Sequence, residues 1–578
     1  MVKTLLKCVR EYKTASLLTP VFVACEVVLE CLLPLIMAQL IDNITGETMS
    51  PILKYGLILI ILALLSLAFG VLDGRMAATA SCGFAKNLRQ DLFFRAQDFA
   101  FADIDTFSVS SLVTRLTTDV TNVQNAYQMI LRMAIRAPLM LIFSVIMSLR
   151  IHPRMSLIFL AMLPILGMAL FGISFAVMPI FKRIFKKYDA LNNSVQENVA
   201  GIRVVKSFVR EDYEIERFNA ASEDVRKDFT KVEKILVLNN PIMMFCIYIA
   251  MLLVSWLGAR TIITSVGSEL TTGQLSSLIN YGVQIMSSMM FVSMAFVMIS
   301  MALESMRRIS EVLNHESSLT SPENGKTEVA DGSVHFEDVS FRYRAGSGLD
   351  VLSHINLDIP SGATVGILGG TGSSKTTLIQ LISRLYDVTE GCVSVGGTDV
   401  REYDLETLRN AVAVVLQKNV LFSGTIRENL RWGDSEASDE ELERVCRLAQ
   451  ADEFIRQMPE GYDTRIEQGG TNVSGGQKQR LCIARALLKK PKILILDDST
   501  SAVDTQTDAL IRRAMEEEIP DTTKIIIAQR VSSVEHADMI LVMDGGRIAE
   551  QGTHEELMAL GGINRDVFDS QTQGKEVA

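Results

Sequence analysis

Long apolar runs without charge dominate the first three hundred positions of the chain. Four of them, 55–72, 155–181, 235–259 and 270–303, contain no Asp, Glu, Lys or Arg. About 20 apolar helical residues cross the ~30 Å hydrocarbon core of a bilayer, so these runs are long enough to span a membrane. Two further candidates, 15–40 and 130–149, are apolar but carry charges. The pattern predicts six membrane-spanning helices, all before residue 305.

Charged residues inside two of these spans need an opposite charge or an aqueous surface. Glu26 and Glu30 lie four residues apart on one helical face, and Arg132 and Arg136 begin the span 130–149. Ionisable side chains are costly in hydrocarbon and usually face a cavity or a partner. Two interpretations stay open. The glutamates line a cavity that favours cations, or they form a structural pair with Arg132 or Arg136.

The sixth span is rich in methionine. Methionine is unbranched and polarisable, so a wall of it adapts to varied apolar ligands, although packing or lipid contact accounts for it equally well. The residues are Met286, Met289, Met290, Met294, Met298 and Met301.

Basic residues are distributed unequally between the loops. The loop at 42–51 contains no Lys or Arg, whereas the loops after the second and fourth spans contain many. Cytoplasmic loops carry this excess, so we expect both termini to be cytoplasmic. The two basic loops are each about 50 residues long and helix-compatible, and helices of ~25 residues would project roughly 35–40 Å. We place their turns near 102–111 and 207–216 and expect them to contact the soluble domain.

The segment 2–13 is amphipathic, with basic residues around an apolar face. It predicts an interfacial helix on the cytoplasmic surface, with a short linker as the alternative. No small-residue cleavage site follows it, so no cleavable signal peptide is expected.

Length and charge indicate two different halves. The 578 residues exceed one ordinary domain, and 48% of them are hydrophobic. Residues 1–320 contain 29 Lys and Arg against 25 Asp and Glu, and the remainder 27 against 42. An acidic soluble half argues against a nucleic-acid partner. The eight cysteines are scattered without a C-x-x-C pair, which favours buried thiols over a disulfide framework or metal site.

The second half begins after a polar linker. We assign 1–309 to a six-span transmembrane domain with two long cytoplasmic loops, 310–332 to the linker and 333–578 to a soluble domain. Beyond the linker, strand and helix patterns alternate, as in an α/β domain.

A glycine-rich loop lies between an apolar strand pattern at 363–368 and a helical pattern at 378–382. Strand, loop and helix in this order form a phosphate-binding loop, whose backbone N–H groups point at phosphates. Lys375 would neutralise phosphate charge and the Thr376 hydroxyl would bind Mg²⁺. The nucleotide-binding residues predicted here are Gly369, Gly370, Thr371, Gly372, Ser373, Ser374, Lys375, Thr376 and Thr377.

Further motifs surround this loop in the sequence. Tyr343 is placed to stack on adenine, and Gln417 ends a strand where it could reach Mg²⁺. A buried strand pattern at 493–496 is followed by Asp497 and Asp498. The run Ser474, Gly475, Gly476, Gln477 leads into a helix, whose N-terminus could bind a phosphate.

These motifs together resemble those of ATP-binding cassette (ABC) exporters, specifically a half-transporter with six spans fused to one cassette. The resemblance covers nearly the whole chain, and the run S-G-G-Q-x-Q-R followed by I-L-I-L-D-D carries it most specifically. It implies an all-α, domain-swapped transmembrane domain and an α/β P-loop nucleotide-binding domain. It also implies two cassettes, with each ATP between one P-loop and the other chain's Ser-Gly-Gly-Gln. The loop turns would then be coupling helices, the second contacting the partner's cassette.

Three positions depart from the family pattern. Asp498 stands where the family has the glutamate that polarises the attacking water, and its shorter side chain falls more than ~1 Å short of that water. Gln529 replaces a histidine that contacts the γ-phosphate, and glutamine carries no positive charge. Ser374 replaces a glycine and crowds the loop. We therefore assign catalytic positions to Asp498, Gln529 and Gln417, and metal ligands to Thr376, Gln417 and Asp497.

The intact Ser474 signature beside an altered catalytic site resembles the degenerate subunit of heterodimeric bacterial multidrug exporters. The expected function is ATP-driven export of a small, amphipathic molecule across the cytoplasmic membrane, using ATP and Mg²⁺ with a second, different half-transporter. The alternatives are a homodimeric exporter with slow hydrolysis, a lipid or peptide exporter, and an ATP-gated channel or regulator. The predicted spans exclude a soluble ATPase acting on nucleic acid.

Overall fold

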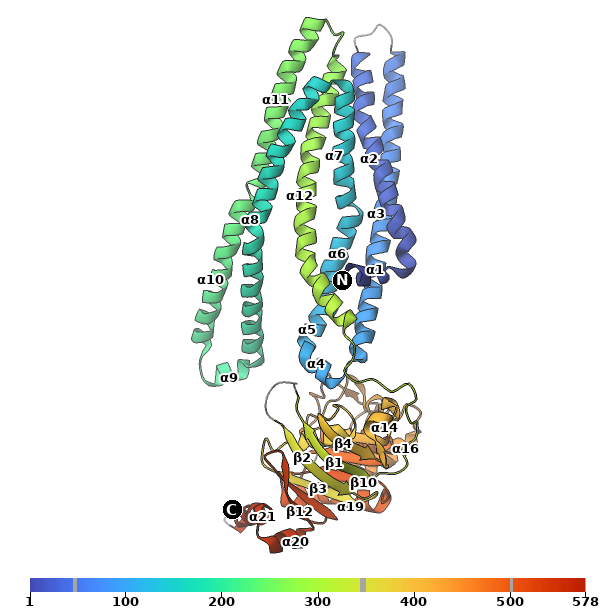
Figure 1. The fold of residues 1–578 in the computed structure, drawn as a ribbon, viewed down its shortest axis with the longest axis vertical. Coiled ribbons are helices and arrows are strands. Elements are labelled where there is room, and N and C mark those ends of the chain that lie inside the picture. The colour runs from blue at the N-terminus through green and yellow to red at the C-terminus, as the bar shows by residue number, and fades with distance from the viewer. Residues whose placement is uncertain (45–48, 344–349, 499–502, 577–578) are drawn as a thin grey trace. The chain divides into compact units, whose positions relative to one another are not determined.

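The computed structural model describes residues 1–44, 49–343, 350–498 and 503–576, which form two compact units. The first unit comprises Met1–Gln97 and Ser108–His315, and the second comprises Asp98–Phe107 and Glu316–Ala578. The short segment Asp98–Phe107 therefore belongs to the second unit, although its neighbours in sequence belong to the first. Figure 1 shows the helices of the first unit in blue to green and the sheets of the second in yellow to red.

The six predicted spans are confirmed as helical segments long and apolar enough to cross a membrane. They are Arg10–Asp42, Ser50–Gln97, Val109–Ile151, Pro153–Phe181, Glu211–Ser265 and Thr272–Asn314. Several continue far beyond the charge-free runs. The 48 residues of one of them, Ser50–Gln97, extend about 72 Å at 1.5 Å per residue, so the helix projects well past a bilayer.

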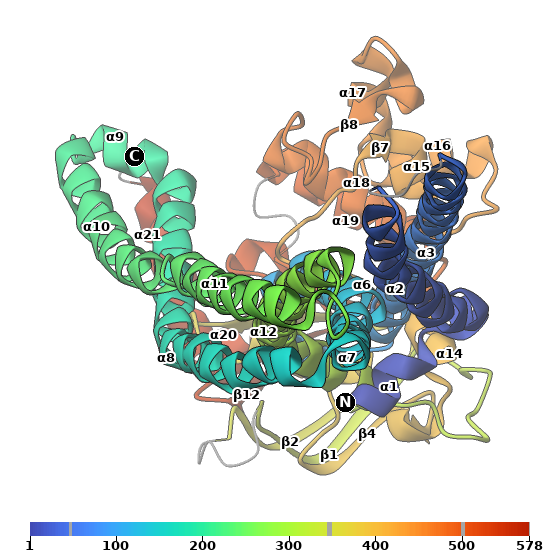
Figure 2. The same ribbon diagram turned by 90° about the horizontal axis from the view of Figure 1, so that it is seen from above.

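The helices of the first unit follow the chain as long antiparallel pairs. They are α1 (Val2–Lys7), α2 (Lys13–Asp42), α3 (Ser50–Gln97), α5 (Val109–Thr114), α6 (Val120–Leu131), α7 (Met133–Ile151), α8 (Pro153–Ala200), α9 (Ile202–Ser207), α10 (Glu211–Leu236), α11 (Asn239–Ser265) and α12 (Thr272–Asn314), with a π-helical turn, η2 (Arg115–Asp119), between α5 and α6. In Figures 1 and 2, α8 lies beside α10 and α11.

Local sequence signals explain where these helices begin. Thr271 caps α12 in a reciprocal capping box with Gln274, which satisfies two backbone N–H groups. Pro153 occupies the first turn of α8, where a missing N–H costs nothing. Between α8 and α10 the chain turns earlier than the predicted 207–216, because the acidic first turn of α10 already begins at Glu211. The first predicted turn coincides with a short helix, α4 (Phe101–Phe107), in the second unit.

The amphipathic N-terminus is two short pieces instead of one helix. α1 ends at Lys7 and a 3-10 turn covers Arg10–Tyr12, since Arg10 adopts a positive φ of 42°. This segment packs on α3, where the Asn87 amide donates to the carbonyl of Cys8 at 3.0 Å and Arg10 pairs with Asp91 at 2.6 Å.

The glutamates of the first span form a structural pair with an arginine, the second of the two interpretations. Arg136 reaches Glu26 at 2.9 Å and Glu30 at 2.7 Å, which joins α2 to α7. Arg132 pairs instead with Asp73 of α3 at 3.1 Å. The ion pairs support the structural interpretation. One guanidinium balances only one of the two carboxylates, so a preference for cations stays a prediction.

The methionines of α12 divide between packing and a cavity. Met286 is fully buried in a core with Phe159 and Ile285, and Met289 and Met290 pack against that core. Met298 and Met301 line a cavity of the first unit. The packing interpretation therefore holds for the first part of the helix, and contact with an apolar ligand stays a prediction for the part that lines the cavity.

The second unit is an α/β domain, as predicted, and its described residues form three sheets. Its six-stranded sheet has the order β12-β11-β3-β10-β9-β6, parallel except for β12, and an antiparallel sheet has the order β2-β1-β4-β5. A third sheet pairs β7 with β8. The two cores behind these sheets are rich in Val, Ile and Leu.

The strands are β1 (Val334–Phe341), β2 (Leu352–Ile359), β3 (Thr364–Gly369), β4 (Glu390–Val395), β5 (Thr398–Asp399), β6 (Val412–Val415), β7 (Gly424–Thr425), β8 (Arg465–Ile466), β9 (Ile493–Asp497), β10 (Thr523–Ile527), β11 (Met539–Asp544) and β12 (Arg547–Gly552). The helices after α4 are α13 (Lys375–Ile382), α14 (Leu405–Ala411), α15 (Ile426–Leu430), α16 (Asp439–Leu448), α17 (Asp452–Gln457), α18 (Gly475–Leu488), α19 (Thr505–Glu518), α20 (His554–Leu560) and α21 (Ile563–Glu576).

Candidate functional site

The topology of the parallel sheet collects the predicted catalytic side chains at one edge. β10 lies between β3 and β9, and β6 follows β9. The glycine-rich loop follows β3, Asp497 ends β9, Gln529 lies two residues after β10 and Gln417 two residues after β6. The carboxyl ends of parallel strands form the ligand-binding edge of open α/β sheets. Site residues up to 121 positions apart, Thr376 and Asp497, thus come into contact because of the strand order.

The glycine-rich loop wraps around the ammonium group of Lys375. Its Nζ donates to the carbonyl oxygens of Gly369 and Gly370, each at 2.8 Å, and approaches the Ser373 hydroxyl at 3.2 Å. Burial lowers the pKa of Lys375 from its ordinary value, and the nearby Asp497 and Asp498 partly oppose this effect. The loop therefore presents a cation at its centre, next to the N-terminus of α13.

Two loop positions need unusual backbone angles. A Cβ atom at Gly369, whose φ is 151°, would lie 2.4 Å from the carbonyl oxygen of Met543, so only glycine fits there. Ser374 caps α13 with φ 73°, in the left-handed region that an L-residue enters at a cost of roughly 1–2 kcal/mol. The position at which the family has glycine thus keeps the glycine conformation in this chain.

Thr376 and Asp497 form a pair of oxygen donors below the loop. The Thr376 hydroxyl donates to Oδ2 of Asp497 at 2.9 Å, and Asp497 is almost completely buried. Burial raises the pKa of Asp497, while the bond from Thr376 and the charge of Lys375 lower it. A hydroxyl and a carboxylate on rigid elements are the hard ligands that Mg²⁺ prefers, so these residues fit the ion.

Asp498 is held by the two glutamine side chains. The amide nitrogen of Gln529 donates to Oδ2 of Asp498 at 2.7 Å, and that of Gln417 approaches the same oxygen at 3.5 Å. Asp498 has a positive φ of 48°, and its backbone N–H donates to Ile527 of the neighbouring strand at 3.1 Å. The three predicted catalytic positions therefore lie within contact of one another.

Tyr343 lies against the helix that follows the loop. Its hydroxyl is 2.8 Å from that of Thr377 and 3.3 Å from the amide oxygen of Gln380, which leaves its ring half-exposed beside α13. The ring also meets that of Tyr386 edge to face, with centroids 5.2 Å apart.

Sequence analysis missed Tyr386, which connects this aromatic residue to α4. The Tyr386 hydroxyl donates to Oδ2 of Asp105 at 2.9 Å, and its ring faces that of Phe101 at 6.1 Å. α4 is anchored a second time, because the backbone N–H of Ser318 donates to Asp103 at 3.1 Å. A tyrosine four residues after the end of α13 gives no signal by itself, so only the fold reveals this connection.

Ser474 occupies the exposed N-terminus of α18. Its hydroxyl accepts from the backbone N–H of Gln477 at 3.2 Å, and the Gln477 side chain accepts from the Ser474 N–H at 3.0 Å. This capping box satisfies two N–H groups reciprocally. The first-turn N–H groups of Gly475 and Gly476 stay at an accessible helix N-terminus, where an anion is stabilised.

Comparisons with known proteins agree with this geometry. Residues 17–289 match the family described as the ABC transporter transmembrane region, and residues 352–501 match the family described as ABC transporter. The uncharacterized ABC transporter ATP-binding protein YfiB of Bacillus subtilis is 34% identical over 567 residues, which cover 98% of each chain. The ATP-dependent lipid A-core flippase of Desulfotalea psychrophila is 34% identical over 472 residues, 80% of each chain.

A solved structure shares the fold over almost the whole length. The structure of a bacterial Atm1-family ABC exporter with ATP bound superimposes with a TM-score of 0.84, covering 97% of this chain and 98% of that one. The two sequences are 24% identical, so this likeness is one of fold.

Proposed function

The chain belongs to the ABC transporter family, and from this premise we propose that it is the hydrolysis-impaired half of a heterodimeric exporter. It is a multi-pass membrane protein with an ABC ATPase domain. In the proposed arrangement it exports a small, amphipathic molecule together with a different half-transporter. Its termini and its second unit lie in the cytoplasm, and its spans cross the cytoplasmic membrane.

The glycine-rich loop and its neighbours would hold ATP. Tyr343 stacks on adenine, the backbone N–H groups of 369–376 receive the phosphates, and Lys375 neutralises their charge. Thr376, Asp497 and Gln417 hold Mg²⁺, which supplies charge neutralisation on the phosphate oxygens when it is bound. This assignment is supported by the position of all these residues at one edge of the sheet.

The contact between Asp498 and Gln529 is the observation that supports a difference between the two ATP sites of the complex. Glutamine can donate to the carboxylate, as it does at 2.7 Å, but it can neither carry a positive charge nor move a proton. Asp498 is one methylene shorter than glutamate, so its carboxylate stays with the amides of the glutamines. Loss of a positioned general base typically costs about 10²–10⁴ in rate. ATP at this site would be retained instead of being turned over.

The exposed Ser474 helix N-terminus is unaltered and would complete the partner's site. Its two glycines and its serine present N–H groups and a hydroxyl to a γ-phosphate bound by the partner's P-loop. A homodimer of this chain would contain two altered sites and no site with the family's glutamate. This argument favours a heterodimer over the homodimeric alternative.

The test compares two variants of the complex with its partner half-transporter. Ser474→Arg places a long cation where the partner-bound γ-phosphate would meet the helix, so we expect near-complete loss of steady-state ATPase activity. Asp498→Asn alters only the impaired site and should cost little. Similar losses from both variants would show that the two sites are equivalent and would overturn the asymmetry. Purification of the chain as an active homodimer would do the same.

A further inference from the structure

A large cavity opens within the first unit between η2, α6, α7, α8 and α12. Its volume is about 1530 Å³, enough for an organic molecule of several hundred daltons. Its charged lining residues are mostly arginines: Arg115, Arg132, Arg136 and Arg308. The glutamates of the first span are not among the residues that line it.

Three of these arginines face the cavity, and two of them have a completely buried carboxylate behind them. The side chains of Arg132, Arg136 and Arg308 are 40%, 31% and 41% exposed. Their partners Asp73 and Asp119 are 1% and 0% exposed. These two pairs are therefore oriented, with the guanidinium toward the cavity and the carboxylate inside the protein. Arg136 is instead shared by Glu26 and Glu30, whose side chains are 10% and 23% exposed.

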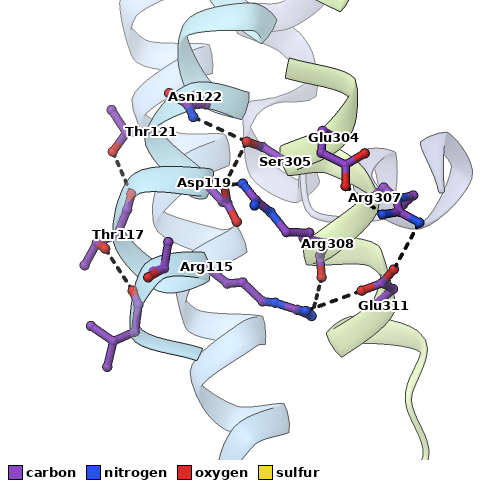
Figure 3. Close-up of polar contacts among 12 residues, drawn as sticks. Arg115, Thr117, Asp119, Thr121, Asn122, Glu304, Ser305, Arg307, Arg308 and Glu311 are labelled. Atoms are coloured by element: carbon purple, nitrogen blue, oxygen red, sulfur yellow. Dashed lines mark hydrogen bonds and ion pairs between the residues drawn. The ribbon is translucent and has the colours of Figure 1, made fainter. Parts of the chain in front are cut away.

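Figure 3 shows how one of these arginines is held. Arg308 reaches Asp119 at 2.6 Å, the Ser305 hydroxyl donates to the same carboxylate oxygen at 2.8 Å, and Arg115 donates to the Arg308 carbonyl at 2.8 Å. Such a cluster fixes the guanidinium before any ligand arrives, which reduces the entropic cost of binding.

Arg132 keeps donors for a ligand. It engages Asp73 through Nε and Nη2, so Nη1 takes no part in the pair. Arginine presents five N–H groups in a planar fork, which suits carboxylate, sulfonate and phosphate groups. An anion in the cavity would thus bind to N–H groups that the buried carboxylates do not use.

Few acidic side chains line the cavity. Glu304 lines the cavity, but Arg307 pairs with it at 2.6 Å from the next turn of α12. Asp119 also lines it but is completely shielded by Arg308 and Ser305. The charged groups that a ligand meets in the lining are therefore mostly guanidinium groups.

Apolar side chains complete the wall. Met133 and Met140 come from α7, and Phe291, Met298 and Met301 from α12. Methionine adapts to irregular apolar shapes and phenylalanine offers a flat face. The lining thus provides an apolar surface close to fixed cations.

We propose that this cavity is the substrate site and that it binds amphipathic anions, with the acidic group on Arg132 and the apolar body against the methionines. This inference rests on the proposed export function, and it reverses the expectation of cationic ligands. The acidic group belongs either to a soluble molecule or to a lipid, since both present the same chemistry to a guanidinium.

The test measures direct binding to the full chain in nanodiscs of phosphatidylcholine. Fluorescein and rhodamine 123 share a xanthene body but carry opposite charge, so fluorescence anisotropy isolates the effect of charge. We expect fluorescein to bind at least about tenfold more tightly, which corresponds to roughly one charge-assisted hydrogen bond. Equal affinities, or tighter binding of rhodamine 123, would overturn the proposal.

Paired variants separate binding from folding. Arg132→Gln combined with Asp73→Asn removes the cation without leaving a buried charge, and should weaken fluorescein binding about tenfold or more. Asp73→Asn alone leaves Arg132 with its full charge for the ligand and should preserve or strengthen binding. A merely structural role of the pair would instead weaken binding in both variants. Arg150→Gln, at the far end of α7, is the matched control and should change nothing.

Two further experiments complete the test. The first distinguishes a lipid ligand from a soluble one, and the second distinguishes failure of the anion site from failure of the proposed export function. If the ligand is a lipid, nanodiscs containing phosphatidylglycerol should compete with fluorescein, whereas a soluble ligand predicts no competition. Either result leaves the anion site in place. Binding is measured without ATP, so selective fluorescein binding without ATP-driven uptake into vesicles would contradict export and not the site. Uptake of rhodamine 123 in preference to fluorescein would contradict the site and not export.

Discussion

Because Asp497 is buried, we expect the binding of Mg²⁺ at the nucleotide site to depend on pH. Burial raises the pKa of this carboxyl above its ordinary value. A carboxyl with a raised pKa is protonated at a higher pH than usual, and only its anionic form binds a divalent cation. We therefore expect the Mg²⁺-dependent part of ATP affinity to fall with decreasing pH, and to begin to fall at a higher pH than an ordinary aspartate would produce.

Nucleotide titrations with and without Mg²⁺ measure this effect. ATP affinity in the presence of a chelator should change much less over the same range. Asp497→Asn should abolish the increment from Mg²⁺ at every pH, since an amide cannot be an anion. A Mg²⁺ increment that stays constant as the pH falls would show that Asp497 is not the titrating ligand.

Residue chemistry was largely predictable at this site, whereas conformation was not. The glycines, Lys375 and Thr376 identify a phosphate loop because their order and spacing are dictated by the loop itself. The left-handed φ of Ser374 and the bond between Gln529 and Asp498 depend on the neighbouring strands. Residues 31 positions apart meet only after β9 and β10 pair, so sequence alone could not supply that contact.

At the scale of elements, Tyr386 connects α4 to the nucleotide site. It donates to Asp105 of α4 and packs edge to face on Tyr343. Tyr386→Phe should remove a hydrogen bond of about 0.5–1.5 kcal/mol and keep the ring contact. Tyr386→Ala should remove both and loosen α4 from its unit. We expect stimulation of ATPase activity by a transported compound to decline in that order.

Basal ATPase activity and ATP affinity provide the control for this prediction. They should change little in Tyr386→Phe, because the ring that supports Tyr343 remains. Full stimulation in Tyr386→Ala would mean that α4 communicates with the nucleotide site by another route.

The cluster in Figure 3 predicts an asymmetry between its two partners. Arg308→Ala would leave Asp119, which is completely buried, without its cation, and breaking a buried pair in this way costs about 3–5 kcal/mol. Asp119→Ala would leave Arg308, which water reaches, so the loss should be smaller. Thermal unfolding in nanodiscs should thus show a larger destabilisation for Arg308→Ala. The reverse order would mean that Asp119 does not depend on Arg308.

Sequence patterns predicted the positions of the helices better than they predicted which helices pack together. Charge-free runs located six spans because hydrocarbon excludes charge over a fixed thickness. Glu26 and Glu30 indicated a buried ion pair and offered Arg132 or Arg136, but the choice of Arg136 follows from the packing of α2 against α7. The assignment of α4 to the second unit follows from contacts with Tyr386 and Ser318, which no periodicity encodes.

At the scale of the whole molecule, the proposed function gives one chain an impaired ATP site and an intact signature for its partner's site. The signature at Ser474 keeps every group that an anion needs, whereas Asp498 and Gln529 replace the family's glutamate and histidine. The sequence already indicated this difference between the sites. In the structure, the side-chain amides of Gln529 and Gln417 lie against the carboxylate of Asp498. The heterodimer that follows from it can be tested with the complex itself.

Single-turnover hydrolysis tests this central claim most directly. In the complex, the partner's catalytic glutamate is changed to glutamine, so that only the site of this chain could hydrolyse ATP. We predict that ATP remains bound and unhydrolysed at this site over many normal turnover times, and that Asp498→Glu with Gln529→His restores measurable hydrolysis there. Rapid hydrolysis of one ATP by the otherwise unaltered chain would show that Asp498 is a competent base and would contradict the account.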